Sequence, residues 1–147
     1  MTIRDATHAD VPRLVEMGCR FIAETTYAQH IQTSPEALST FALRLIDDES
    51  GLLLVAVNGD DQPQGMIGML IYPHFMSGER VAAECFWWVN PAERGTTGLR
   101  LFKRAEAWAI AHHAMRIQTV APSPDVERIY QRLGYTWIEA AYSRTVA

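Results

Sequence analysis

The segment from Trp87 to Leu99 has the residue types of an anion-binding site. An apolar strand ends at Pro91, a loop of small residues follows, and a long helix begins at residue 97. The first amides of a helix have no intrahelical partner, and together with the helix dipole they favour a phosphate. The residues that would approach such an anion are Arg94, Gly95, Thr96, Thr97 and Gly98. The segment indicates either a phosphate-binding loop or a strand-to-helix turn that needs glycine only for its geometry.

Two other side chains have the chemistry for proton transfer. Glu84 stands in the middle of an otherwise apolar strand, where a carboxylate is costly unless it is paired or functional. It is therefore an acid or base at a site, or a residue that faces solvent or pairs with Arg80. Tyr130 lies on the apolar stripe of a helix, where a core tyrosine with a satisfied hydroxyl is the simpler interpretation.

The composition excludes several classes of protein. Among 147 residues, 48% are hydrophobic and the net charge is −4, which excludes disordered, collagen-like and disulfide-scaffold chains and disfavours a nucleic-acid binder. The longest apolar run, residues 52–57, is far short of the roughly 20 residues of a membrane span. The amino terminus resembles no signal peptide, and Cys19 and Cys85 are expected as buried thiols. We expect a cytoplasmic protein without a metal centre.

The apolar spacing predicts one domain over residues 1–147 with the order β-α-α-β-β-β-α-β-α-β. It is an α/β (α+β) fold in which helices cover a mixed sheet, and its three central strands form an antiparallel meander. The expected strands span residues 2–5, 51–57, 64–72, 80–89, 116–120 and 135–146. The expected helices begin between residues 7 and 10, at Ser34, near residue 97 and at Ser123, and the two serines act as caps.

This order of elements and three of its segments resemble the GCN5-related N-acetyltransferase (GNAT) family. The segments are Ile3-Arg4-Asp5-Ala6, the strand–Pro–Arg94-Gly95 loop–helix unit, and Ile129-Tyr130-Gln131-Arg132-Leu133-Gly134-Tyr135. The resemblance covers nearly the whole chain. It implies an acetyl-CoA-dependent N-acetyltransferase fold and activity.

The resemblance also implies roles for individual residues. The loop would bind the pyrophosphate of acetyl-CoA, and the strand before it would hold the pantetheine arm through its backbone. Glu84 would deprotonate the acceptor amine, and Tyr130 would protonate the departing thiolate. The acceptor would be an amine on a small molecule or a peptide, and no metal would be needed. The implied cofactor-binding residues are Trp88, Val89, Asn90, Arg94, Gly95, Thr96, Thr97, Gly98, Leu99 and Ser123.

The loop departs from the family pattern. With Gly98 as the anchor, Glu93 stands where glutamine or arginine is usual, and Thr96 stands where glycine is usual. Ser123 replaces an asparagine that many members carry. The departures motivate a second hypothesis, a non-catalytic acyl-CoA-binding regulatory or interaction module, and a third, another α/β ligand-binding domain. Edge strands and the strand expected at the carboxyl terminus would allow a homodimer.

Overall fold

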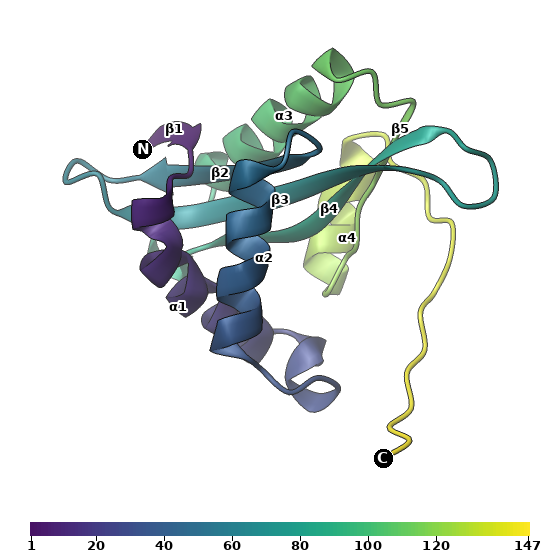
Figure 1. The fold of residues 1–147 in the computed structure, drawn as a ribbon, viewed down its shortest axis with the longest axis horizontal. Helices are drawn as coiled ribbons and strands as arrows, with labels where there is room; N and C mark the ends of the chain where they lie inside the picture. The colour runs from purple at the N-terminus through teal and green to yellow at the C-terminus, as the bar shows by residue number, and fades with distance from the viewer.

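A computed structural model describes all 147 residues and contains one five-stranded sheet in the order β1-β2-β3-β4-β5 (Figure 1). Neighbouring strands from β1 to β4 are antiparallel, and β5 runs parallel to β4. The predicted meander and mixed sheet are therefore confirmed. The strands are β1 (Thr2–Asp5), β2 (Gly51–Val57), β3 (Pro63–Pro73), β4 (Arg80–Val89) and β5 (Arg116–Gln118).

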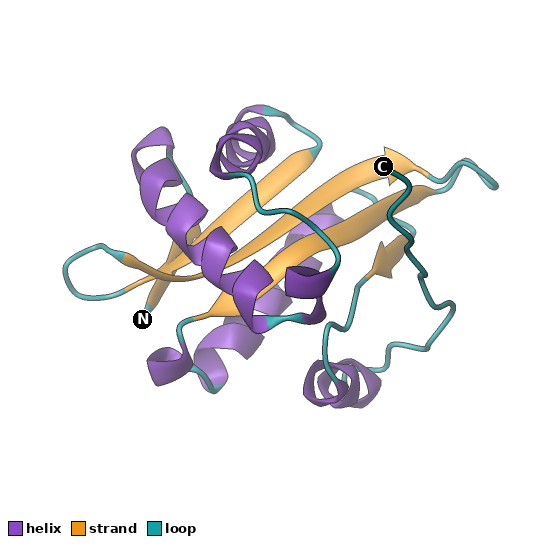
Figure 2. Cartoon of the chain, turned by 90° about the horizontal axis from the view of Figure 1, so that it is seen from below, coloured by secondary structure: helices purple, strands orange, loops and turns teal.

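Helices cover both faces of the sheet, as Figures 1 and 2 show. Ser34 and Ser123 begin α2 and α4, where each side chain accepts a hydrogen bond from the backbone amide three residues on, as predicted. One face carries α1 (Val11–Glu24) and α2 (Pro35–Asp47), and the other carries α3 (Thr96–Ala111) and α4 (Pro124–Arg132). Short 3-10 turns are η1 (His8–Asp10), η2 (Thr26–Gln29) and η3 (Pro91–Glu93).

Each face of the sheet has its own apolar core. Under α1 and α2 the core is centred on Met17, Leu45 and Val55. Under α3 and α4 it is centred on Phe102, whose ring packs against the rings of Trp87 and Tyr130. Because both faces are covered, β2 and β3 read as nearly continuous apolar runs rather than as alternating patterns.

A β-bulge at Cys85 reverses the side-chain alternation of β4. Gly68 pairs with Phe86 and Met69 pairs with Glu84, so Cys85 has no partner on β3. An extra residue of this kind changes which face the following side chains meet. Glu84 consequently contacts Tyr130 of α4 on one face of the sheet, whereas Phe86 joins the core under α1 and α2 on the other face.

Strands β4 and β5 pair only briefly. Their register runs from Val81–Arg116 to Ala83–Gln118 and stops there, although β4 continues to Val89. The strand expected over residues 116–120 is thus shorter than predicted. Beyond Ala83, β4 has a free edge on the side of β5.

The prediction of a strand over residues 135–146 was wrong. Tyr135 still packs on Phe102, but no regular element follows α4, and the chain then runs away from the body (Figure 1). Trp137 is 70% exposed and Tyr142 is 95% exposed. The alternating aromatic and β-branched residues are typical of a strand, but a strand also needs an edge to pair with. The three residues of β5 provide too short a ladder.

Because Phe102 has no exposed surface and its ring touches three other aromatic rings, we expect Phe102→Ala to lower the free energy of unfolding by about 3–5 kcal/mol. Ile110→Ala removes a comparable group from a site on the same helix that is 68% exposed. It should change stability by no more than about 0.5 kcal/mol. Urea unfolding of both variants measures the difference. Equal losses would contradict the packing described here.

Candidate active site

A cleft of about 610 Å³ opens where β4 and β5 diverge. Its walls come from the end of α1, the carboxyl-terminal half of β4, the first turn of α3, and α4 with the segment that leads into it. The lining residues are Phe21, Glu24, Thr25, Trp87, Trp88, Val89, Arg94, Gly95, Gly98, Leu99, Pro122, Ser123, Asp125, Val126, Ile129, Arg132 and Leu133.

The free edge of β4 presents backbone groups to this cleft. The Asn90 amide donates to the Gln64 carbonyl of β3 at 2.8 Å, so the N–H and C=O of the preceding residue, Val89, point away from β3. The Val89 carbonyl indeed accepts a hydrogen bond from Nε of Arg94 at 3.0 Å. By strand alternation the backbone groups of Trp87 point the same way. An extended ligand can therefore pair with this edge as an added strand would.

The first turn of α3 forms another wall of the cleft. Its N-cap, Gly95, has φ of +120°, a conformation that only glycine adopts easily, and a Cβ placed there would meet no atom within 4 Å. The amides of Thr96, Thr97 and Gly98 lie in the first turn, where helix geometry provides no acceptor. No side chain caps α3, in contrast to α2 and α4. The loop therefore fits an anionic group.

The indole of Trp87 adds a buried donor without a partner. Its Nε1 is inaccessible to solvent and has no acceptor within hydrogen-bond distance. A Cβ built on Gly98 would lie 3.4 Å from Cζ2 of this ring, so the indole packs directly against the start of α3. Most buried donors in proteins are satisfied, and an orphaned one at the wall of a cleft suits a ligand that brings an acceptor.

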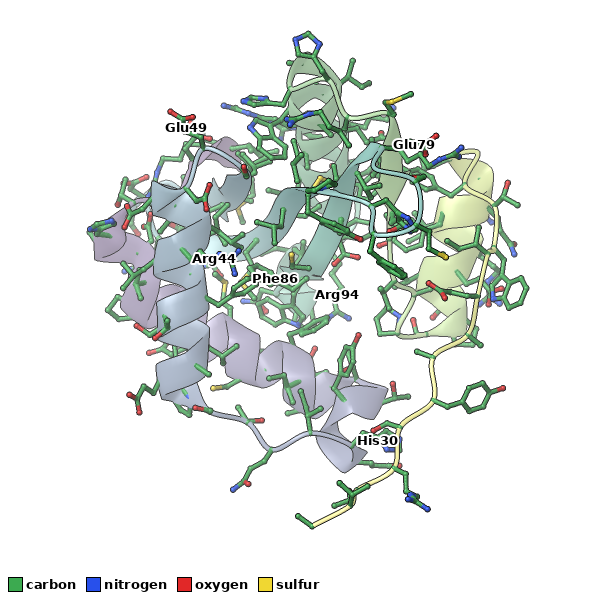
Figure 3. The ribbon with its side chains drawn as sticks, turned by 45° about the vertical axis from the view of Figure 1, so that its right-hand side comes forward. His30, Arg44, Glu49, Glu79, Phe86 and Arg94 are labelled. Atoms are coloured by element: carbon green, nitrogen blue, oxygen red, sulfur yellow. The ribbon has the colours of Figure 1, made fainter.

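A cluster around Glu24 holds the mouth of the cleft together. Glu24 Oε2 accepts hydrogen bonds from Nη2 of Arg94 at 3.0 Å and from Nε1 of Trp88 at 2.9 Å. Arg20 lies 3.6 Å from the same carboxylate, and its guanidinium stacks 4.8 Å from the centre of the Trp88 ring. Figure 3 shows Arg94 near the middle of the molecule, on the side of α2 that faces α4. The cluster ties the end of α1 to β4 and the loop.

Glu84 and Tyr130 meet below the cleft. The Tyr130 hydroxyl donates to Glu84 Oε2 at 3.2 Å, and the Val120 amide donates to the same oxygen at 3.3 Å. Only 8% of Glu84 and 5% of Tyr130 are exposed. Two residues that are 46 positions apart in the sequence therefore form one buried pair.

Burial sets the protonation of this pair. Desolvation raises the pKa of Glu84 from its ordinary 4.5 to about 7, although the bonds from Val120 and Tyr130 oppose the rise. Desolvation, and then the nearby Glu84 charge, raises the pKa of Tyr130, so this phenol stays protonated. At neutral pH about half of Glu84 is ionised and able to take a proton, and Tyr130 is protonated.

The structure places most of the predicted binding residues around the cleft. Trp88, Val89, Arg94, Gly95, Gly98, Leu99 and Ser123 line it. Asn90, Thr96 and Thr97 do not. The Asn90 side chain instead bonds Gln64 Oε1 at 3.0 Å and the Ala92 amide at 3.4 Å, and Thr97 is buried.

Sequence reasoning missed the wall from α1 and most of the wall from α4. Glu24 is some 60 residues from β4, and no local pattern distinguishes it from the other acids on exposed helix surfaces. Phe21 and Val126 have the spacing of ordinary core residues. Only the packing of distant elements brings these side chains to the cleft.

A model of the acetyltransferase (GNAT) family matches residues 16–135. The chain belongs to the GNAT acetyltransferase family. GNAT proteins transfer acetyl groups and generally use acetyl-CoA, and the matched range contains Glu84, Tyr130 and every cofactor-binding residue that the sequence predicted. No curated protein sequence matches this chain.

Solved structures share the GNAT fold. A structure described as a transcriptional regulator from Bacillus halodurans C-125 has a TM-score of 0.80 and 23% identity over 99% of both chains. An aminoglycoside antibiotic 6'-N-acetyltransferase from Acinetobacter haemolyticus has a TM-score of 0.73 and 20% identity over 100% of both chains. A ribosomal-protein-alanine N-acetyltransferase from Brucella melitensis biovar Abortus 2308 has a TM-score of 0.70 and 16% identity over 99% of this chain and 100% of that one. At these identities the likeness establishes the fold alone.

No helix combines the length and apolar character required to cross a bilayer. No three His, Cys, Asp or Glu side chains are grouped where they could hold a metal ion.

The raised pKa of Glu84 predicts a pH-dependent effect on stability. A carboxyl whose pKa is higher in the folded protein stabilises the fold fully below pH 4.5, and this contribution is lost as the pH rises toward about 7. Relative to wild type, Glu84→Gln should therefore gain about 3 kcal/mol in free energy of unfolding between these pH values. Urea unfolding at pH 4.5, 6 and 8 measures the gain. A constant difference between variant and wild type would mean that Glu84 titrates normally.

Proposed function

We propose that the chain is a single-domain acetyl-CoA-dependent N-acetyltransferase that moves the acetyl group to a primary amine by direct attack. The observation that carries this proposal is the buried Glu84–Tyr130 pair beneath a cleft formed by a free strand edge and an uncapped helix. Family membership supports acetyl transfer in general, and the pair supplies the proton chemistry that transfer to an amine requires.

Each wall of the cleft matches a different part of acetyl-CoA. The free amides at the start of α3 suit the pyrophosphate, and Gly95 leaves room for its approach. The β4 edge at Trp87 and Val89 suits the amide groups of the pantetheine arm. The buried indole N–H of Trp87 has no partner in this chain, and a shift of the ring would let it donate to a ligand oxygen. Acetyl-CoA supplies the thioester that is consumed.

Acetyl transfer to an amine moves protons at both Glu84 and Tyr130. An ammonium acceptor first loses one proton to solvent. The neutral amine then attacks the thioester carbonyl, the C–N bond forms, and the C–S bond breaks. Glu84 takes the second proton from the nitrogen, and Tyr130 gives its proton to the thiolate. Because Tyr130 already donates to Glu84, the proton that Glu84 has gained can restore the phenol, and the products are the amide and CoA.

The thiol nearest to Glu84 does not favour an acyl-cysteine intermediate. Desolvation, followed by the Glu84 charge, raises the pKa of Cys85 to about 12. A thiol is nucleophilic only as the thiolate, which is scarce at neutral pH with such a pKa. Direct attack by the amine is therefore the simpler chemistry.

A binding module without turnover is the second candidate. The unusual Glu93 and Thr96 of the loop favour it, and so does the ion pair that occupies Arg94 with Glu24. The two candidates differ in one observable. The enzyme releases CoA in the presence of an amine, whereas the module binds acetyl-CoA without consuming it.

Gly98 tests the binding of acetyl-CoA. Since Gly98 packs against Trp87 and Val89, Gly98→Leu should drive a side chain into the cleft and weaken acetyl-CoA binding at least tenfold in calorimetry. Gly98→Ala is the matched control, because its Cβ would make an ordinary 3.4 Å contact with Trp87. Unchanged affinity in Gly98→Leu would place the cofactor elsewhere.

Glu84 and Tyr130 are tested by pH–rate profiles. With acetyl-CoA saturating, the wild type should lose activity below about pH 7 as Glu84 becomes protonated, which gives the pH–rate profile an acidic limb. Glu84→Gln should remove this acidic limb. Tyr130→Phe should lower kcat about 100-fold. It should also shift the limb to higher pH, because it deletes a hydrogen bond that lowers the pKa of Glu84.

A similar pair outside the cleft provides the control. The Tyr135 hydroxyl donates to Glu106 at 2.8 Å, and neither residue lines the cleft. Tyr135→Phe should leave both kcat and the acidic limb unchanged. Equal effects of Tyr130→Phe and Tyr135→Phe on kcat and on the acidic limb would mean that Tyr130 has a purely structural role.

A further inference from the structure

A second cavity, of about 210 Å³, lies on the opposite face of the sheet from α3 and α4. It is lined by α1, α2, η2 and neighbouring strands, it is partly open to solvent, and 12 of its 13 lining residues are hydrophobic. Its lining includes Leu14, Gly18, Leu38, Phe41, Met66 and Phe86. Figure 3 shows Phe86 beside α2 and close to Arg44 in that view, and the ring centroids of Phe86 and Phe41 are 6.2 Å apart.

This apolar cavity adjoins the space beside the Glu84–Tyr130 pair. A small space of about 20 Å³ next to Glu84 and Tyr130 is walled in part by Phe21, Tyr27 and Cys85. The same three residues also wall the apolar cavity, and the rings of Phe21 and Tyr27 are 5.8 Å apart. On its other side the small space shares a wall with the large cleft. The bulge at Cys85 therefore lies between the apolar cavity and the small space beside Glu84.

The charges around the apolar cavity disfavour a second cationic group on the acceptor. No acidic or basic side chain lines the cavity. Arg44 acts electrostatically on Cys85 from outside the lining, and the only carboxylate that lines the small space is Glu84. A second ammonium group placed in the cavity would lose its hydration without gaining a partner.

We infer that the acceptor is a primary amine carried on one aromatic ring or a short branched alkyl group, and that this apolar group occupies the cavity lined by Leu38, Phe41 and Phe86. The inference rests on the proposed acetyl transfer. A 150 Å³ cavity lined by aliphatic and aromatic side chains already binds benzene, so 210 Å³ accommodates a ring with a short arm. The amine at the end of that arm then reaches Glu84 past Phe21 and Tyr27.

A panel of amines tests the inference with the wild-type chain. Phenethylamine and ethylamine share the reacting group, and burial of the ring should raise kcat/KM about 10- to 100-fold. Butylamine and 1,4-diaminobutane match in length but differ in distal charge, and butylamine should be the better substrate by at least tenfold. A preference for the diamine, or for an aminoglycoside such as kanamycin, over phenethylamine would overturn the inference.

A cavity-filling variant gives a second test. Leu38 borders the cavity from α2, so Leu38→Trp should reduce the preference for phenethylamine over ethylamine at least tenfold. It should leave the KM for acetyl-CoA unchanged. Ile110→Trp adds the same side chain at an exposed position outside all of these cavities and should not alter the preference. An unaltered preference in Leu38→Trp would contradict occupation of the cavity.

The two proposals fail in different ways. If acetyl-CoA neither binds nor is consumed with any amine, the proposed acetyl transfer fails, and this inference fails with it. If acetyl-CoA is consumed and charged amines are preferred, only the inference about the acceptor fails.

Discussion

The early end of pairing between β4 and β5 is the constraint on which the rest of the site depends. After Ala83 the two strands no longer share hydrogen bonds, and β4 continues to Val89 with one free edge. Unpaired backbone groups of a strand need a partner, and a cleft forms because no strand of this chain supplies it. Glu84 is the first residue after the pairing ends, and its carboxylate accepts the amide of Val120 from the diverging segment.

The position of Glu84 explains its chemistry. Burial alone would keep the carboxyl neutral, while the Val120 amide and the Tyr130 hydroxyl favour the charged form. The balance leaves the pKa near neutrality, where a group can both take and release a proton. Tyr130 is held between Trp87, Phe102 and Tyr135, so its hydroxyl has little freedom to leave Glu84. Packing in this core thus determines the geometry of the proton transfer.

The bulge at Cys85 links the two faces of the sheet. Strict alternation would place Glu84 and Phe86 on the same face, but the extra residue turns Phe86 toward α2. Trp87 then packs into the core under α3. Trp88 packs into the core on the other face and donates a hydrogen bond to Glu24 of α1. A single extra residue therefore lies between the small space beside Glu84 on one side and the apolar cavity on the other.

The sequence by itself determined the element order from β1 to α4, the serine caps, the antiparallel meander and the family. These features depend on local apolar spacing, turn residues and short motifs, which neighbouring residues encode together. It did not determine that residues 135–146 lack a strand, because pairing depends on the length of a distant edge. Nor did it place Glu24 against Arg94 or Tyr130 against Glu84. Those contacts join residues that are 70 and 46 positions apart in the sequence, so only tertiary packing decided them.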